Sequence, residues 1–434
     1  MLLVSADWVL PVCARPIRDG AVLVDDGLIV AVGARSELEP LASEAAGREH
    51  FAGCSITPGL VNAHTHLTLS ALSGVVPPAP FHEWLPRLVA ALRPWEIADH
   101  EASGIIGAEE SLARGVTVVG DIAYGAAEVV SASRAGLGGV YYWELLGLEP
   151  DDLAQQLAHL RYPSEPSAFG PRVVCGLSPH SPYTSGPELL RAVHQRAEGL
   201  GVPLAIHTAE SDAEIQLLRD GSGPLAAVAS RTAAGFEPPG VSTTAYLAGL
   251  GVLSGATAVH CCHLEAGDVE LLASNVRGVV TCPRSNRYLG NPPPQIAPLL
   301  DAGIPVGIGT DSSASNHDLD LMAELRELAL AQPELGADTL LRIATMDGAR
   351  AIGCSDRFGS LAAGMQADLA VFRATSDQRP AEAVIAGHGD EEVCAVMSGG
   401  AWRARDGVAL QRDASAHARA AEARRRSTEA LTAG

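Results

Sequence analysis

Lysine is absent from this chain of 434 residues, since all 30 of its basic side chains are arginines. Mechanisms that need a Schiff-base lysine, a P-loop lysine or a carbamylated lysine are therefore excluded. Positive charge is also scarce, because 51 acidic side chains leave a formal net charge of −21. So acidic a chain argues against general nucleic-acid binding and against attachment to an anionic membrane.

The C-x-x-C spacing is missing too, although the chain has eight cysteines. Its absence excludes a zinc knuckle and the cytidine-deaminase type of zinc site. Scattered cysteines in a long chain predict reduced, mostly buried thiols. The chain lacks an uncharged apolar run of about 18 residues, and its first residues lack the basic segment of a signal peptide. We therefore expect a cytoplasmic protein without a membrane span.

Short strands are predicted at both ends of the chain. The turn Asp25-Asp26-Gly27 lies between two β-branched runs, which is the pattern of a hairpin. Residues 368–372 and 393–397 are similar short runs near the other end. Because chain termini often lie close together, residues 1–54 and 357–412 are expected to form one small β-sandwich domain.

The middle of the chain alternates short apolar runs with stretches of helical character. The runs are 56–67, 116–122, 139–146, 172–180, 203–210, 256–263, 278–286 and 305–312. Eight such units predict an α/β fold with parallel strands, a (β/α)8 TIM-type barrel over residues 55–356. A doubly wound open sheet is the alternative. Residues 413–434 are expected to form a polar C-terminal tail, as a solvated helix or a disordered segment.

Ionisable side chains lie near the ends of several runs, where such a barrel places its catalytic groups. The first run ends in His64-Thr65-His66, and residues two apart on a strand face the same side. His207, His260 and Asp311 lie at the ends of later runs. Because each buried polar group needs a partner, this set predicts a divalent metal ion.

Imidazole and carboxylate ligands suit Zn²⁺ or Fe²⁺ better than Ca²⁺ or Mg²⁺. Such an ion can lower the pKa of a bound water from ~15.7 to about 7, which gives a hydroxide nucleophile at neutral pH. The residues therefore indicate metal-dependent hydrolysis.

Several motifs resemble the amidohydrolase superfamily, in the branch of purine and nucleoside deaminases and chlorohydrolases. They are PGLVNAHTH at 58–66, GVT at 115–117, HTAE at 207–210, HC at 260–261, CPRSN at 282–286 and GTDS at 309–312. The resemblance covers most of the chain and implies a (β/α)8 barrel with a β-sandwich built from both chain ends. Without a lysine it implies a mononuclear centre, which in this family favours deamination of an aromatic amidine.

The resemblance assigns metal-binding roles to four side chains. His64, His66 and His207 resemble the histidine ligands of one divalent ion, Zn²⁺ or alternatively Fe²⁺. Asp311 resembles the carboxylate that binds this ion and helps to deprotonate the water.

Two further side chains resemble catalytic groups of the family. Glu210 resembles the proton shuttle, and His260 resembles the histidine that orients the hydroxide and stabilises the transition state. Strand alternation puts His260 and His263 on opposite faces. The family pattern selects His260 as the inward residue.

Substrate contacts follow from the same resemblance. His180 resembles the histidine that contacts ribose in adenosine-type deaminases, and a capping or packing role is the alternative. Trp84 could stack on a base, or it could belong to an ordinary amphipathic helix.

The segment 282–289 differs from adenosylhomocysteine and methylthioadenosine deaminases, which usually have N-P-x-S-N-x-x-L at this place. Arg284 and Arg287 flank Ser285 and Asn286 here, and we count all four among the candidate substrate-binding residues. Arginine binds carboxylates in a bidentate manner, so the pair suggests a trap for an anionic substrate tail. Solvated loop arginines are the alternative.

This variant, together with the runs VVGD at 118–121 and ELLG at 144–147, most resembles the aminodeoxyfutalosine deaminases of the futalosine route to menaquinone. That resemblance implies an adenine nucleoside substrate that carries a benzoate, converted to futalosine and ammonia. The alternatives are another purine deaminase, acting on adenosylhomocysteine, methylthioadenosine or adenosine, a chlorohydrolase or amidase of the same superfamily, and a non-enzymatic binding protein. The number of chains stays open, and a homodimer is one option.

Overall fold

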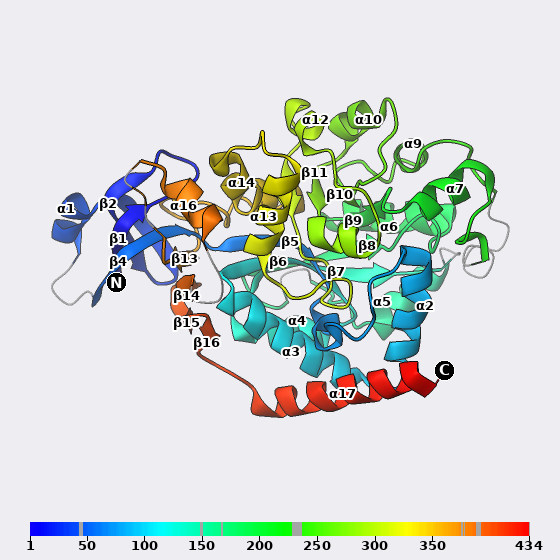
Figure 1. Cartoon of the computed structure of the whole chain (residues 1–434), viewed down its shortest axis with the longest axis horizontal. Helices are drawn as coiled ribbons and strands as arrows, with labels where there is room; N and C mark the ends of the chain where they lie inside the picture. Colours follow the sequence, from blue (N-terminus) through cyan, green and yellow to red (C-terminus); the bar gives the residue numbers. More distant parts are fainter. Residues whose placement is uncertain are drawn as a thin grey trace.

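The structure is a computed structural model, and it describes residues 1–42, 47–147, 151–165, 168–227, 237–374, 376, 378–387 and 392–433. Figure 1 shows two groups of strands, one from the middle of the chain and one from its two ends. The first group positions the candidate site.

Each of the eight predicted apolar runs overlaps one parallel strand, and the first run also includes the end of β4. These strands are β5 (Leu60–Thr65), β6 (Val116–Ala123), β7 (Gly138–Leu145), β8 (Val173–Pro179), β9 (Ala205–Thr208), β10 (Thr257–His260), β11 (Gly278–Thr281) and β12 (Val306–Ile308). They pair in parallel as two four-stranded sheets, ordered β5-β6-β7-β8 and β9-β10-β11-β12. Isolated parallel bridges connect the two sheets at both edges, Leu177 with Leu204 and Thr65 with Asp311.

Helices follow most of these strands and pack around them (Figure 1). Their apolar faces join the strands in one large buried cluster, in which Leu189, Leu190 and Val193 represent α6. The helices of this part are η2 (Leu67–Leu72), α2 (Phe81–Leu92), α3 (Ile97–Ala113), α4 (Ala126–Ala135), α5 (Asp151–His159), α6 (Pro187–Leu200), α7 (Asp212–Asp220), α9 (Thr243–Gly249), α10 (Asp268–Asn275), α11 (Pro283–Tyr288), α12 (Ile296–Asp301), α13 (Leu321–Ala331), α14 (Ala337–Ile343) and α15 (Met346–Ile352).

The two chain ends share one sheet, as the sequence predicts. Its strands are β1 (Leu2–Val9), β2 (Ile17–Asp25), β3 (Leu28–Ala34), β4 (Gly47–Pro58), β13 (Leu369–Phe372), β14 (Val393–Ser398), β15 (Ala401–Arg405) and β16 (Val408–Ala409), with the short helices α1 (Arg35–Leu38), η1 (Glu39–Leu41) and α16 (Pro380–Ala386) beside them. The order is β16-β15-β14-β13-β4-β1-β2-β3, so hydrogen bonds connect all eight strands. A division into the two layers of a sandwich stays a prediction.

Gly59 forms the junction between this sheet and the parallel strands. A Cβ atom there would lie 2.1 Å from the Thr117 hydroxyl, so the close approach requires glycine. The Gly59 N–H donates to the carbonyl of Asp368 at 2.9 Å. The first parallel strand is thereby anchored to the C-terminal part of the chain.

The predicted C-terminal tail forms the helix α17 (Ala414–Ala433), which packs against α3 and α2 (Figure 1). Ala420 and Ala423 are buried on its inner face. Arg426 contacts the fully buried carboxylate of Asp99 at 2.7 Å, and Arg419 contacts the same carboxylate at 2.8 Å. The helix is therefore not solvated on all sides, because small residues and two arginines dock it.

The thiols and the helices agree with the other expectations. All eight cysteines are free, and all of them except Cys13 are buried. Among the described residues, the helices are too short or too polar to span a bilayer.

We expect Arg426→Ala to destabilise the protein by about 2 kcal/mol, because a buried carboxylate loses one of its two arginine partners. Arg425 is the matched control, since among the described residues it pairs only with the exposed Glu422 and Glu429 on the outer face of the same helix. Urea unfolding measures both variants. Equal effects of the two substitutions would show that the Asp99 contact does not dock the helix.

Candidate metal centre and active site

Imidazoles from three strands meet at one point. His64 ends close to His66 and His207, with ring centroids 5.1 Å apart in each pair. The ligand nitrogens of these three side chains all lie within 4.8 Å of one another. His260 lies beside them, with its ring centroid 5.5 Å from that of His64.

Asp311 follows β12 and faces two of these imidazoles. Its Oδ1 lies 3.6 Å from Nε2 of His64 and 3.4 Å from Nε2 of His66. Its Oδ2 accepts hydrogen bonds from the hydroxyls of Ser285 and Ser315, at 2.6 and 2.7 Å. Burial acts to raise the pKa of Asp311, but His64 and His66 hold it well below its usual range.

The imidazoles are oriented as metal ligands require. Nδ1 of His207 donates to the carbonyl of His180 at 2.7 Å, which leaves Nε2 as a lone-pair donor. Nε2 of His64 is buried without a hydrogen-bond partner among the described residues. Burial lowers the pKa of His64, and it lowers the pKa of His66 to about 3. Three neutral imidazoles and one carboxylate fit a divalent ion such as zinc or iron.

Glu210 and His260 lie beside this group. Oε1 of Glu210 is 3.7 Å from Nε2 of His260, whose Nδ1 lies 3.1 Å from Oδ1 of Asn286. Burial raises the pKa of Glu210 to about 8, and the charge of Asp311 adds to the rise. Glu210 therefore holds its proton at neutral pH and can act as a general acid.

The turn before Glu210 is fixed by a residue that the motifs did not indicate. The carboxylate of Glu214 accepts the backbone N–H groups of Ala209 and Glu210, each at 2.9 Å, and the Thr243 hydroxyl at 2.9 Å. Ala209 has a positive φ of 50°, so this part of the backbone is strained. Glu210 and Glu214 are four residues apart at the start of α7, which Ser211 caps. This spacing is the local signal that could have indicated the role of Glu214.

Positive φ angles also mark the ends of two other strands, at His260 (73°) and Cys261 (51°) after β10 and at Asp311 (55°) after β12. The turn at His260 directs its ring into the cavity. His263 is not among the residues that line the cavity, so the structure separates these two histidines as the family pattern indicates.

One cavity joins these groups. Trp84 and His180 are in its wall, as the resemblance implies, and Nε1 of Trp84 donates to the carbonyl of Ala314. The wall also contains residues without a sequence signal, because the folding of distant segments brings them there. The full lining is His66, Leu69, Phe81, Trp84, Leu85, Leu88, Tyr124, Glu144, His180, His207, Glu210, His260, Leu289, Asp311 and Ser312.

The structure does not bring Arg284 and Arg287 to this cavity. Nη1 of Arg284 lies 2.6 Å from Asp318, and Arg287 is 64% exposed and pairs with Glu327 at 3.2 Å. Successive residues of α11 point about 100° apart, so these arginines face α13 and the surface. Ser285 and Asn286 contact Asp311 and His260 instead of lining the cavity.

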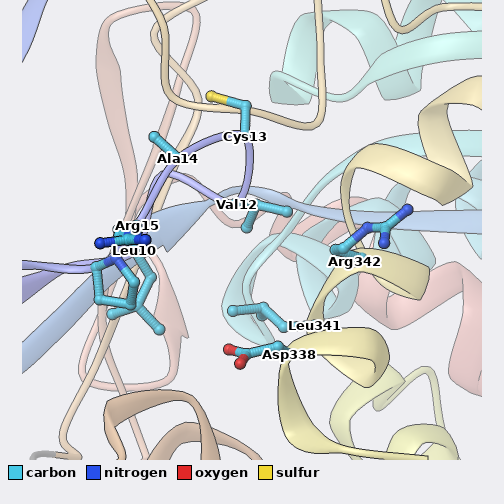
Figure 2. Close-up of a pocket in the computed structure, with 9 residues that line it drawn as sticks. Leu10, Val12, Cys13, Ala14, Arg15, Asp338, Leu341 and Arg342 are labelled. Atoms are coloured by element: carbon cyan, nitrogen blue, oxygen red, sulfur yellow. The ribbon is translucent and has the colours of Figure 1, made fainter.

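A second cavity, shown in Figure 2, lies between the chain-end sheet and α14. Its lining includes Cys13, Arg15, Asp338 and Arg342. None of the predicted site residues is in its wall.

The chain matches the amidohydrolase family over residues 55–403, and it belongs to that family. It is therefore a hydrolase that acts on C–N bonds, which confirms the resemblance seen in the motifs.

Named relatives extend this result. The chain is 35% identical to the aminodeoxyfutalosine deaminase of Deinococcus radiodurans over 352 residues, 77% of this chain and 81% of that one. It is 32% identical to the 5-methylthioadenosine/S-adenosylhomocysteine deaminase of Desulforudis audaxviator over 386 residues, 86% and 85% of the two chains. The structure of an adenosine deaminase from Xanthomonas campestris with bound zinc has a TM-score of 0.86 and 27% identity, and covers 99% of this chain and 98% of its own.

We expect the purified protein to hold about one divalent ion per chain and His207→Ala to lose most of it. His263→Ala is the matched control, because it removes a nearby imidazole outside the cavity. Elemental analysis after dialysis against buffer without metal gives the ion content. Retention of the ion by His207→Ala would contradict the ligand set.

Proposed function

We propose that this protein is a deaminase of adenine nucleosides, which replaces the amino group of the base by oxygen and releases ammonia. The observation that carries the proposal is the position of Glu210, a carboxyl with a raised pKa beside the His64, His66, His207 and Asp311 cluster. Deamination of a purine needs an acid at a ring nitrogen and an activated water at the neighbouring carbon.

We also infer the architecture and the setting of this site. The eight parallel strands form a (β/α)8 barrel over residues 55–356, since bridges connect the two sheets at both edges. Residues 1–54 and 357–412 form the β-sandwich domain. The free thiols suit a reducing compartment, so we place the enzyme in the cytoplasm.

His64, His66, His207 and Asp311 would hold one divalent ion, zinc or alternatively iron. When bound, this ion lowers the pKa of a water molecule and so supplies the nucleophile. The carbonyl of His180 and the hydroxyls of Ser285 and Ser315 keep the ligands oriented.

Glu210, Asp311 and His260 carry out the proton transfers. Glu210 protonates the ring nitrogen next to the amino-bearing carbon, while Asp311 and His260 take a proton from the attacking water. That proton then goes to the leaving amine, and the proton of the new hydroxyl group returns to Glu210. Nucleoside and water thus give the hypoxanthine nucleoside and ammonia.

The wall of the cavity suits a planar base. Phe81, Trp84, Leu85 and Leu88 of α2 present apolar and aromatic surface opposite the polar cluster. Such a wall binds a purine by contact with its faces and keeps bulk water from the reacting groups.

A neighbouring groove indicates that the substrate is longer than adenosine. Tyr124 and Glu144 line both the cavity and this groove, which continues past Leu146 to the side chains of α5. The groove opens to solvent, and His159 is the one imidazole among its described lining residues. A substituent on the sugar can therefore leave the cavity without meeting a wall.

Among such nucleosides we propose aminodeoxyfutalosine, with futalosine and ammonia as products and a place in menaquinone synthesis. The 35% identity to a deaminase named for this substrate supports the choice. Adenosylhomocysteine and methylthioadenosine are the alternatives, supported by the relatives named for them.

Ammonia release and the ultraviolet change from adenine to hypoxanthine should appear with aminodeoxyfutalosine, adenosylhomocysteine, methylthioadenosine or adenosine, and the highest kcat/KM should belong to aminodeoxyfutalosine. Guanine and a chlorinated triazine serve as controls. Turnover of the triazine alone would replace deamination by dechlorination. A higher kcat/KM for adenosylhomocysteine would support deamination but contradict aminodeoxyfutalosine as the preferred substrate.

Glu210→Gln should keep its metal content and lower kcat by about 10³-fold, because an amide cannot deliver the proton. Glu109→Gln makes the same chemical change in a buried glutamate that contacts α17, and it should keep its turnover. A Glu210→Gln enzyme with turnover like the unmodified protein would refute the assigned acid.

A further inference from the structure

Glu144 is a buried carboxyl that the proposed reaction does not use. It lies on β7, is 7% exposed, and lines both the metal-side cavity and the groove beside it. The hydroxyl of Tyr124 shares a hydrogen bond with this carboxyl group. The oxygen Oε1 is buried without a partner that meets the geometry of a hydrogen bond among the described residues. Buried polar atoms are usually hydrogen-bonded, so a bound ligand is a plausible source of the donor for this oxygen.

A second metal ion does not account for this oxygen. Glu144, His180 and His207 have ligand atoms within 4.8 Å of one another. His207, however, offers its free nitrogen to the first centre and uses the other for the carbonyl of His180. Nδ1 of His180 lies 2.7 Å from the hydroxyl of Thr184. His207 therefore has no nitrogen left for a second ion.

The support beneath Glu144 is rigid. The carboxylate of Glu128 accepts the backbone N–H of Tyr124 at 2.9 Å, and that of Asp121 accepts the backbone N–H of Leu67 at 2.9 Å. Asp121 and Glu128 are themselves buried. Tyr124 is thus fixed through its backbone, and its hydroxyl fixes one oxygen of Glu144.

We propose that Glu144 binds a hydroxyl group of the nucleoside sugar, and that Tyr124 is the residue that positions Glu144 for this contact. The inference depends on the proposed function, since it needs a base in the metal-side cavity. The sugar then lies where cavity and groove meet, and Glu144 is the carboxyl at that junction. Glu144 is a determinant of specificity that separates ribosides from deoxyribosides.

The test compares adenosine with 2′-deoxyadenosine, 3′-deoxyadenosine and 2′,3′-dideoxyadenosine. With the unmodified enzyme, at least one single deletion should lower kcat/KM by about tenfold or more, the effect of one lost hydrogen bond. Glu144→Gln should lower kcat/KM for adenosine by a similar factor, chiefly through KM, and leave the dideoxy substrate unaffected. Tyr124→Phe should act in the same direction, and Glu109→Gln is the control.

The outcomes separate this inference from the proposed function. If the unmodified enzyme deaminates all four nucleosides equally well, the role of Glu144 is overturned while the deaminase assignment stands. An equal loss on all four substrates in Glu144→Gln, or loss of its metal ion, would show a catalytic or structural role and also overturn it. If no adenine nucleoside is deaminated, both proposals fail.

Discussion

The carboxylate of Asp311 faces His64 and His66 at 3.6 and 3.4 Å, and the chemistry of the cavity is arranged around that contact. These groups come from opposite ends of the parallel-strand region, and the bridge between Thr65 and Asp311 joins those ends. The metal centre therefore depends on the same pairing that connects the two sheets. A substitution that breaks the bridge between Thr65 and Asp311 would disturb both the fold and the metal centre.

Many hydrogen bonds near the cavity orient the side chains of the candidate site. Asp311 is oriented by two serine hydroxyls, and His207 is oriented by a backbone carbonyl. Glu214 fixes the turn before Glu210. Non-glycine residues with positive φ, of order 1–3 kcal/mol of strain each, occur at three strand ends of this cavity. The surrounding hydrogen bonds keep the backbone in this strained conformation. Such strain is typical of a site that is preorganised for its substrate.

The sequence predicted the parts of this structure that depend on local pattern. Eight apolar runs gave eight strands, and the polar residues at their ends met because parallel strands end on the same side. Patterns could not show the direction of Arg284, which α13 and Asp318 decide. The ELLG run at 144–147 contains Glu144 without giving it a role, and Tyr124 belongs to no motif. The neighbouring strands β6 and β7 bring the two residues together. The docking of α17 was missed because its buried face consists of small alanines that give little hydrophobic signal.

We infer that His64, His66, His207 and Asp311 together bind one catalytic ion. Diffraction from a crystal grown with zinc, recorded at the zinc absorption edge, locates this ion. We expect one anomalous peak at about 2.0–2.2 Å from the three imidazole nitrogens and from Asp311. A peak that lies elsewhere, or imidazoles that turn away from an ion bound to other residues, would contradict it.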